Sequence, residues 1–137
     1  MNTVICSQIK MANLYIEKTK KTPEITFLKN GDLHIMGSCI PEDANAFFHP
    51  LMLWMDDFSK KPSDTINLTI DLEYINTSST TLIIKFMRKA IEIDIEKSSI
   101  KIIWKYDPED EDAYEQGEML QKILKHPILL VSNQIKG

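Results

Sequence analysis

Hydrophobic and polar residues alternate along several stretches of the chain, and a period of two is typical of a half-buried β-strand. The clearest case is residues 65–74, where Ile66, Leu68, Ile70 and Leu72 alternate with polar residues. The pattern predicts strands over residues 14–18, 24–28, 33–37, 65–74, 99–106 and 128–131. We expect the first to be an edge strand and the last to be a short buried strand.

A turn signal separates the second and third predicted strands. Asn30 and Gly31 lie between them, and an Asn-Gly pair supplies the positive φ angles that a type I′ turn requires. We therefore expect residues 24–37 to form an antiparallel hairpin closed by a turn of that type.

Apolar residues recur with the 3.6-residue period of an amphipathic helix in three other stretches. The predicted helices are residues 41–60, residues 79–94 and a segment that starts at Pro108. Pro41 and the acidic residues after it suit a first helical turn, whereas Pro50 predicts a kink or a break into two short helices. The expected apolar face of the first helix comprises Phe47, Leu51, Trp54, Met55 and Phe58.

Strands and helices alternate after the hairpin, which predicts crossover connections and a mixed, mostly parallel sheet. The hairpin supplies an antiparallel edge, and about three main helices complete the α/β fold. Residues 1–12 show no clear period and are expected to form a loose N-terminal segment. The chain has 137 residues, enough for one hydrophobic core, so we expect a single domain over residues 13–137.

Charge and composition narrow the range of functions. The net charge is −4 and no basic stripe is visible, so we expect no nucleic-acid partner. The sequence has no run of about 18 apolar residues and no secretory pattern, so we expect neither membrane insertion nor export. Cys6 and Cys39 do not indicate a disulfide framework, and we therefore expect a cytoplasmic protein.

Sequence motifs for catalysis and cofactor binding are absent. The chain lacks phosphate-binding glycine loops, the nucleophile-elbow motif and zinc-protease motifs. Its three histidines, His34, His49 and His126, do not have the spacing of metal ligands. We therefore expect no catalytic residue, no cofactor and no metal site. A hydrolase that uses His34 with Asp71 or Glu73 is the weakest alternative, because no nucleophile–base spacing supports it.

Two features suggest contacts with other proteins. The acidic run in residues 107–118 is explained by its favourable interaction with a helix N-terminus, although a basic partner would also suit it. Phe47 and Phe48 are adjacent and cannot both face the sheet, so one of them, with Met52, could form an apolar patch for a partner. The candidate partner-surface residues are Phe48, Met52, Asp110 and Glu111.

A run of hydroxyl side chains lies between the strand 65–74 and the helix 79–94. Its residues are Thr77, Ser78, Ser79, Thr80 and Thr81, preceded by Tyr74, Ile75 and Asn76. Four backbone N–H groups at a helix start lack intrahelical partners, and the helix dipole is positive there, so the position suits a phosphate. Capping by Asn76 or Thr77 explains part of the run. The remaining hydroxyls leave room for a phosphoacceptor.

Three blocks of the sequence resemble the SiaC family of bacterial regulatory phosphoproteins. Residues 40–54 are similar to its Y-P-E-N-A…F-F…W segment, with Ile40 and Asp43 in place of the tyrosine and the asparagine. Residues 71–79, D-L-E-Y-I-N-T-S-S, are similar to its D-L-x-Y-x-N-T-S-S signature. Residues 104–118 match a third block, which contains W-K-Y-D, the acidic run and G-E. The resemblance is collinear from about residue 24 to residue 131.

The resemblance implies a STAS-like fold, related to anti-sigma-factor antagonists, and a non-enzymatic partner-switching role. In the family, a cognate protein kinase phosphorylates the threonine of the N-T-S-S motif, and a PP2C-type phosphatase removes the phosphate. The unphosphorylated form binds an effector, such as a diguanylate cyclase. The matching phosphoacceptor is Thr77. The alternates are Ser78 and Ser79, and the surrounding residues are Tyr74, Asn76 and Thr80.

A second interpretation of the same junction is a sensor domain that binds a small ligand or a free anion. The N–H groups at the helix start would serve such a ligand equally well. The sequence leaves this alternative open, together with the identity of the effector.

Overall fold

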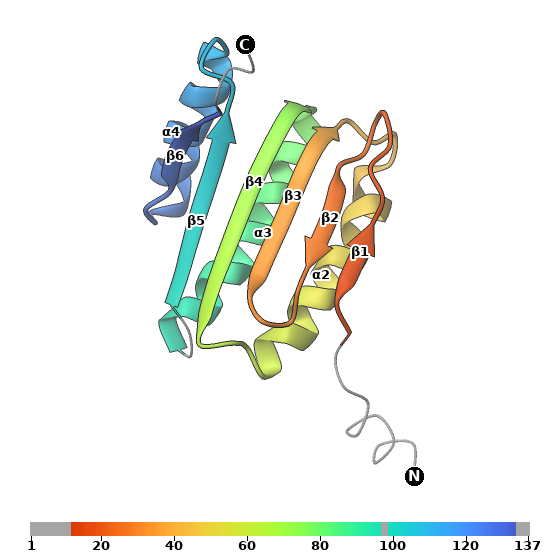
Figure 1. Cartoon of the computed structure of the whole chain (residues 1–137), viewed down its shortest axis with the longest axis vertical. Helices are drawn as coiled ribbons and strands as arrows, with labels where there is room; N and C mark the ends of the chain where they lie inside the picture. Colours follow the sequence, from red (N-terminus) through yellow and green to blue (C-terminus); the bar gives the residue numbers. More distant parts are fainter. Residues whose placement is uncertain (1–11, 97–98, 134–137) are drawn as a thin grey trace.

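The computed structural model describes residues 12–96 and 99–133, which form one six-stranded sheet and three helices (Figure 1). In chain order the elements are β1 (Leu14–Ile16), β2 (Glu24–Phe27), β3 (Asp32–Cys39), α2 (Ala44–Lys60), β4 (Thr65–Ile75), α3 (Thr77–Glu96), β5 (Ser99–Tyr106), α4 (Glu111–Leu124) and β6 (Leu129–Ser132). The first predicted strand is therefore present, and the expectation for residues 1–11 lies outside the described part.

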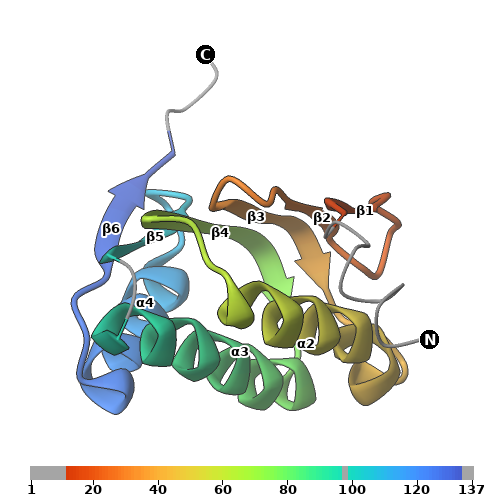
Figure 2. The same cartoon turned by 90° about the horizontal axis from the view of Figure 1, so that it is seen from below.

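The strands lie in the sheet in the same order as in the sequence. β1, β2 and β3 pair antiparallel, whereas β3, β4, β5 and β6 pair parallel. Each parallel connection passes through a helix to the next strand, and a constant crossover hand places all such helices on one face. Figure 2 shows α2, α3 and α4 together beneath the sheet. The predicted mixed α/β fold with an antiparallel N-terminal hairpin is confirmed.

The core lies between this sheet face and the helices. Ile66, Leu68 and Ile70 of β4 are fully buried, as the alternation predicts. An aromatic cluster packs across the layers, because Phe27 of β2 lies 5.3 Å, between ring centroids, from both Trp54 of α2 and Phe86 of α3. The hydrophobic period of two therefore identified the strand face that the helices cover.

The first helix differs from the prediction in three respects. It begins at Ala44, because the Asp43 side chain accepts a hydrogen bond from the Ala46 N–H (3.0 Å) and caps the helix. It continues through Pro50 to Lys60 without a break, although a proline inside a helix removes a backbone hydrogen bond. Phe48 and Leu51 are buried on either side of the proline, and this packing holds the helix together. Phe48, not Phe47, belongs to its buried face. The predicted break into two helices is therefore wrong. Phe47, expected on the apolar face, is half-buried and packs against the edge of the core.

The hairpin is present, but its turn is not of type I′. Gly31 has a φ of 104°, whereas Asn30 is not among the described residues with positive φ. The Gly31 N–H donates to the Leu28 carbonyl (3.0 Å), and the Leu28 N–H donates to the Asp32 carbonyl (2.9 Å). This pattern is that of a three-residue connection with one left-handed glycine. The Asn30 side chain accepts from the Asp32 N–H (3.0 Å) instead of entering the left-handed region.

The C-terminal helix packs closely on the sheet at Gly117. A Cβ atom at this position would lie 2.8 Å from Trp104 Cδ1 and 2.6 Å from Leu130 Cδ2. The helix begins at Glu111, not at Pro108, because the Asp110 side chain caps it by accepting from the Ala113 N–H. β6 is a half-exposed edge strand, so the expectation of a buried final strand is wrong.

Candidate functional site

The junction between β4 and α3 is organised by Asn76. Its side-chain oxygen accepts a hydrogen bond from the Ser79 N–H (3.0 Å), and its carbonyl accepts from the Thr80 N–H (3.0 Å). Asn76 is therefore the helix cap, as one of the two capping predictions stated. Its backbone N–H donates to the Cys39 carbonyl (3.0 Å), and its side-chain amide donates to the Pro41 carbonyl (3.3 Å). These bonds fasten the helix start to the end of β3.

The first four of the five hydroxyl residues that follow Asn76 differ in exposure. Thr77 and Ser78 are exposed, Thr80 is half-buried, and Ser79 is completely buried. The Thr80 hydroxyl donates back to the Asn76 carbonyl (3.1 Å). Only Thr77 and Ser78 therefore present hydroxyls to solvent in the first four positions of α3. Ser79 is inaccessible to a kinase in this conformation, so the structure contradicts its choice as an alternate phosphoacceptor.

The buried Ser79 hydroxyl lies against the thiol of Cys39. It makes no well-formed hydrogen bond within the described part of the chain. Burial raises the pKa of the Cys39 thiol, and the neighbouring Ser79 hydroxyl partly offsets this rise. A neutral thiol is a poor nucleophile, so this pair fits a packing role beneath the exposed hydroxyls.

Two backbone donors at the helix start have no partner among the described residues. The Ser79 N–H and the Thr80 N–H are occupied by Asn76, which leaves the N–H groups of Thr77 and Ser78 available, because the first N–H groups of a helix lack intrahelical acceptors. They lie at the positive end of the helix dipole. An anion attached to Thr77 would therefore meet favourable local electrostatics.

A surface ion pair lies on the segment that Asn76 contacts. Lys21 Nζ is 2.8 Å from Glu42 Oε1, one residue beyond Pro41. The hydrogen bond to Lys21 lowers the pKa of the Glu42 carboxyl, and the same bond raises the pKa of Lys21. Both side chains are exposed, so Lys21 can exchange this carboxylate for another anion at little cost.

The remaining predicted residues are distributed over several elements. Tyr74, 66% exposed, stands at the end of β4 beside the junction. Asp110 caps α4, and Glu111 is exposed in its first turn. Met52 is half-buried on α2. Phe48 is only 1% exposed, so its prediction as a partner-facing residue is wrong: the helix turns Phe48 into the core and leaves its neighbour half-buried.

The hydrolase alternative gains no support from the sheet. His34 of β3 is paired in register with Thr69, whereas Asp71 is paired with Met36. The Asp71 carboxylate accepts a hydrogen bond from the Asn133 side chain (3.1 Å). Among the residues that the structure describes, no group of three histidine, cysteine, aspartate or glutamate side chains could hold a metal ion. Of the described helices, none is long and apolar enough to span a bilayer.

Comparison with known proteins places this geometry in context. The model of the SiaC family of regulatory phosphoproteins matches residues 16–133, which include every strand and helix from β2 to β6. The chain belongs to the SiaC family. A curated relative, an uncharacterised protein of Pseudomonas aeruginosa strain UCBPP-PA14, is 25% identical over 88% of this chain and 96% of its own length.

Solved structures of SiaC from Pseudomonas aeruginosa share the fold. Apo-SiaC superposes with a TM-score of 0.80 at 24% identity, covering 88% of this chain and 99% of that chain. SiaC in its complex with the diguanylate cyclase SiaD superposes with a TM-score of 0.79 at 24% identity, covering 88% and 99%. In that complex SiaC is described as the activator of SiaD. At 24% identity, these superpositions show that the chain has the fold of SiaC.

Proposed function

We propose that this chain is a non-enzymatic partner-switching protein of the cytoplasm, phosphorylated on Thr77. A cognate protein kinase adds the phosphate and a PP2C-type phosphatase removes it. The unphosphorylated form binds and controls an effector, which we propose to be a diguanylate cyclase. Membership of the SiaC family supports the regulatory role, and the SiaC–SiaD complex gives a precedent for the effector class.

The observation that carries the proposal is the exposure of Thr77 at the first position of α3. A kinase can reach its hydroxyl without unfolding the helix. A phosphate brings about −1.5 to −2 charges and three strong acceptor oxygens. In the free protein, the unpaired N–H groups of Thr77 and Ser78 and the helix dipole would stabilise it, by up to about 2 kcal/mol.

The same phosphate would oppose an effector that covers the helix start. Burying the dianion in an interface requires removal of its water, which costs several kcal/mol unless cations compensate. A complete reversal of occupancy takes about 5.5 kcal/mol of differential affinity. The binding free energy lost with the contacts at Thr77, added to the desolvation cost, is of this order. A single modification can therefore switch the chain between partners.

Intact mass measurement after incubation with the cognate kinase tests the site. We expect wild type to gain one phosphate and Thr77→Ala to gain none. Ser78→Ala is the matched control, because Ser78 is the other exposed hydroxyl, and it should be phosphorylated like wild type. Equal phosphate uptake by Thr77→Ala and wild type would refute the assignment.

A second candidate function is an anion or small-ligand sensor, favoured by the two unoccupied N–H groups at the start of α3. A thermal-shift screen with inorganic phosphate and nucleotides separates the two candidates. Under the switch proposal the free anion binds weakly, because only the covalent link holds the phosphate there, and the shifts stay small. A large shift without any protein partner would favour the sensor.

A further inference from the structure

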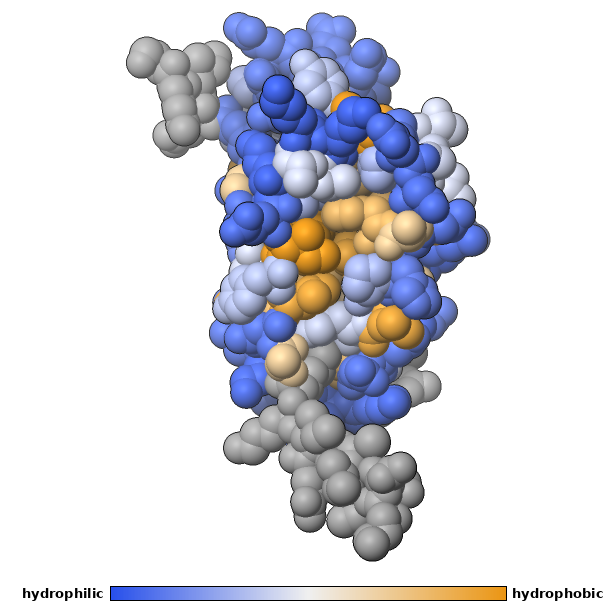
Figure 3. Space-filling model, turned by 90° about the vertical axis from the view of Figure 1, so that its right-hand side faces the viewer, coloured by the Kyte–Doolittle hydropathy of each residue, from blue (hydrophilic) through white to orange (hydrophobic). Residues whose placement is uncertain are grey.

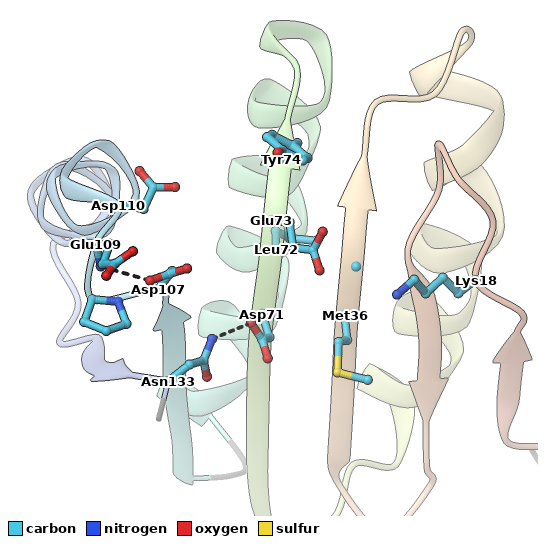
Figure 4. Close-up of a pocket in the computed structure, with 12 residues that line it drawn as sticks. Lys18, Met36, Asp71, Leu72, Glu73, Tyr74, Asp107, Glu109, Asp110 and Asn133 are labelled. Carbon is cyan, nitrogen blue, oxygen red and sulfur yellow. Dashed lines mark hydrogen bonds between the residues drawn. The ribbon is translucent and has the colours of Figure 1, made fainter. Parts of the chain in front are cut away.

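A groove of about 940 Å³ opens on the sheet face opposite the helices (Figure 4). Its floor is the ends of β3 and β4, and one wall is the loop between β5 and α4. In Figure 2, α2, α3 and α4 all lie on the other face of the sheet. Within the described residues, no helix covers this face. The groove is therefore open to a partner.

The groove carries strong negative charge. Five carboxylates line it: Asp71, Glu73, Asp107, Glu109 and Asp110. Lys18 is the one lining residue with positive charge and extends from the opposite side (Figure 4). Lys105 of β5 lies beside Asp71 on the same sheet face, because the two residues are paired in register. None of the five acids is in an ion pair within the described chain. A concave surface with a net charge of one sign attracts ligands of the opposite sign.

The arrangement of the acids does not suit a metal ion. The described residues contain no set of three ligating side chains close enough to hold one. The charges come from β4 and from the β5–α4 loop, on two sides of the groove. Asp107 and Asp110 also accept backbone hydrogen bonds at the start of α4. Carboxylates distributed in this way match several lysine or arginine side chains of one peptide better than a single metal ion.

Two exposed apolar side chains lie among these acids. Met36 is 46% exposed and Tyr74 is 66% exposed, and both line the groove. Tyrosine and methionine are enriched at protein interfaces, where they provide large contact areas, and methionine adapts to irregular partners. A single inorganic ion would make no favourable contact with these side chains. A peptide that carries apolar residues among its cations would contact both side chains.

We propose that the groove binds a basic segment of a protein partner, with apolar side chains over Met36 and Tyr74 and lysines or arginines toward the carboxylates. The proposal rests on the proposed function only in that the chain acts by binding proteins. It does not depend on phosphorylation of Thr77. The two claims can therefore fail separately.

The test uses the unphosphorylated full chain and a short fluorescent peptide in which lysines and arginines flank a leucine–tryptophan pair. Fluorescence anisotropy measures its dissociation constant. We expect Glu73→Gln with Asp107→Asn to weaken binding at least tenfold. We expect Met36→Ala with Tyr74→Ala to weaken it by a similar factor. Glutamine and asparagine keep the shape of the acids, and circular dichroism checks that each variant is folded.

The matched control is Glu115→Gln with Glu118→Gln, which removes two exposed acids of α4 outside the groove. This control should bind the peptide like wild type. Equal weakening by the two acid pairs would mean non-specific attraction and would overturn the proposal. The proposal would also be overturned if Met36→Ala with Tyr74→Ala left the dissociation constant unchanged, or if the peptide did not bind at millimolar concentration.

Discussion

Asn76 is the residue on which the geometry of the candidate site depends. It caps α3 with its side-chain oxygen and contacts the end of β3 and Pro41 with its other groups. Its capping role could be predicted, because an asparagine before a helical period is a standard start signal. Its bonds to Cys39 and Pro41 could not, because they join positions 35 or more residues apart that only the parallel pairing brings together.

Replacing Asn76 by alanine should destabilise the protein. We expect the free energy of unfolding to fall by about 1–2 kcal/mol, because a helix cap and the bond to Pro41 are lost. Urea denaturation measures the change. Ser78→Ala, at an exposed position in the same turn, should stay within about 0.5 kcal/mol of wild type. Equal stabilities of Asn76→Ala and wild type would show that the cap contributes nothing.

Ser79 should behave differently from its exposed neighbours. Its hydroxyl is fully buried without a well-formed hydrogen bond, and an unsatisfied buried hydroxyl is unfavourable. We expect Ser79→Ala to leave the free energy of unfolding unchanged or to raise it by up to about 1 kcal/mol. Phosphate uptake should also be unchanged. A loss of stability above about 1 kcal/mol would imply a hydrogen bond of Ser79 that the structure lacks.

At the scale of elements, the sequence predicted the kinds of element better than their ends and faces. The alternation in β4 and the period of α3 were sufficient, because most of the apolar residues of each element are buried in the core. The turn at Gly31 and the passage of α2 through Pro50 were mispredicted. At the turn, a three-residue connection with one left-handed glycine replaces the expected two-residue turn. In α2, the buried face on both sides of Pro50 outweighs the local preference for a break.

The space-filling view in Figure 3 shows the side of the molecule that carries β1 and α2, with hydrophobic residues gathered between hydrophilic ones. Among the described residues, the exposed large apolar side chains include Tyr15 of β1 and Leu53 of α2, at 67% and 51% exposure. The adjacent Phe47–Phe48 pair had suggested a patch on α2. The exposed apolar residue of that helix is Leu53, because the helical period, not adjacency, decides the face.

The packing of α4 on the sheet gives a prediction at the element scale. In a helix interior, alanine is favoured over glycine by about 1 kcal/mol. At Gly117, however, a Cβ would contact Trp104 and Leu130 below 3 Å, and overpacking costs about 1–3 kcal/mol. The net effect is a fall in the free energy of unfolding of up to about 2 kcal/mol for Gly117→Ala. Glu118→Ala, exposed on the same helix, is the control. A stabilised Gly117→Ala would contradict this packing.

At the scale of the whole molecule, the fold brings two surfaces to one end of the sheet. The first is the start of α3 with Thr77, and the second is the acidic groove that Tyr74 borders. Sequence reasoning identified Thr77, Tyr74 and Asp110, but not the groove. Asp71 and Glu73 become neighbours of Asp107 and Glu109 only through the parallel pairing of β4 with β5.

A phosphate on Thr77 should affect partner binding differently at the two surfaces. Thr77 is three residues from Tyr74 along the chain, at most about 11 Å between Cα atoms, which is close to the Debye length in physiological salt. A phosphate on Thr77 adds negative charge there, so it should not weaken binding of the basic peptide to the groove. Anisotropy titration of protein with phosphothreonine at position 77 measures this. Markedly weaker binding would show that the surfaces overlap.

The central claim is that a phosphate on Thr77 excludes the effector. Isothermal titration of the proposed effector, a diguanylate cyclase, with the unmodified protein, and with protein carrying phosphothreonine at position 77, tests it most directly. A desolvation cost of about 3 kcal/mol alone predicts a dissociation constant roughly a hundredfold higher for the phosphorylated protein, and the loss of contacts at Thr77 would raise it further. Equal dissociation constants for the two forms would contradict the account.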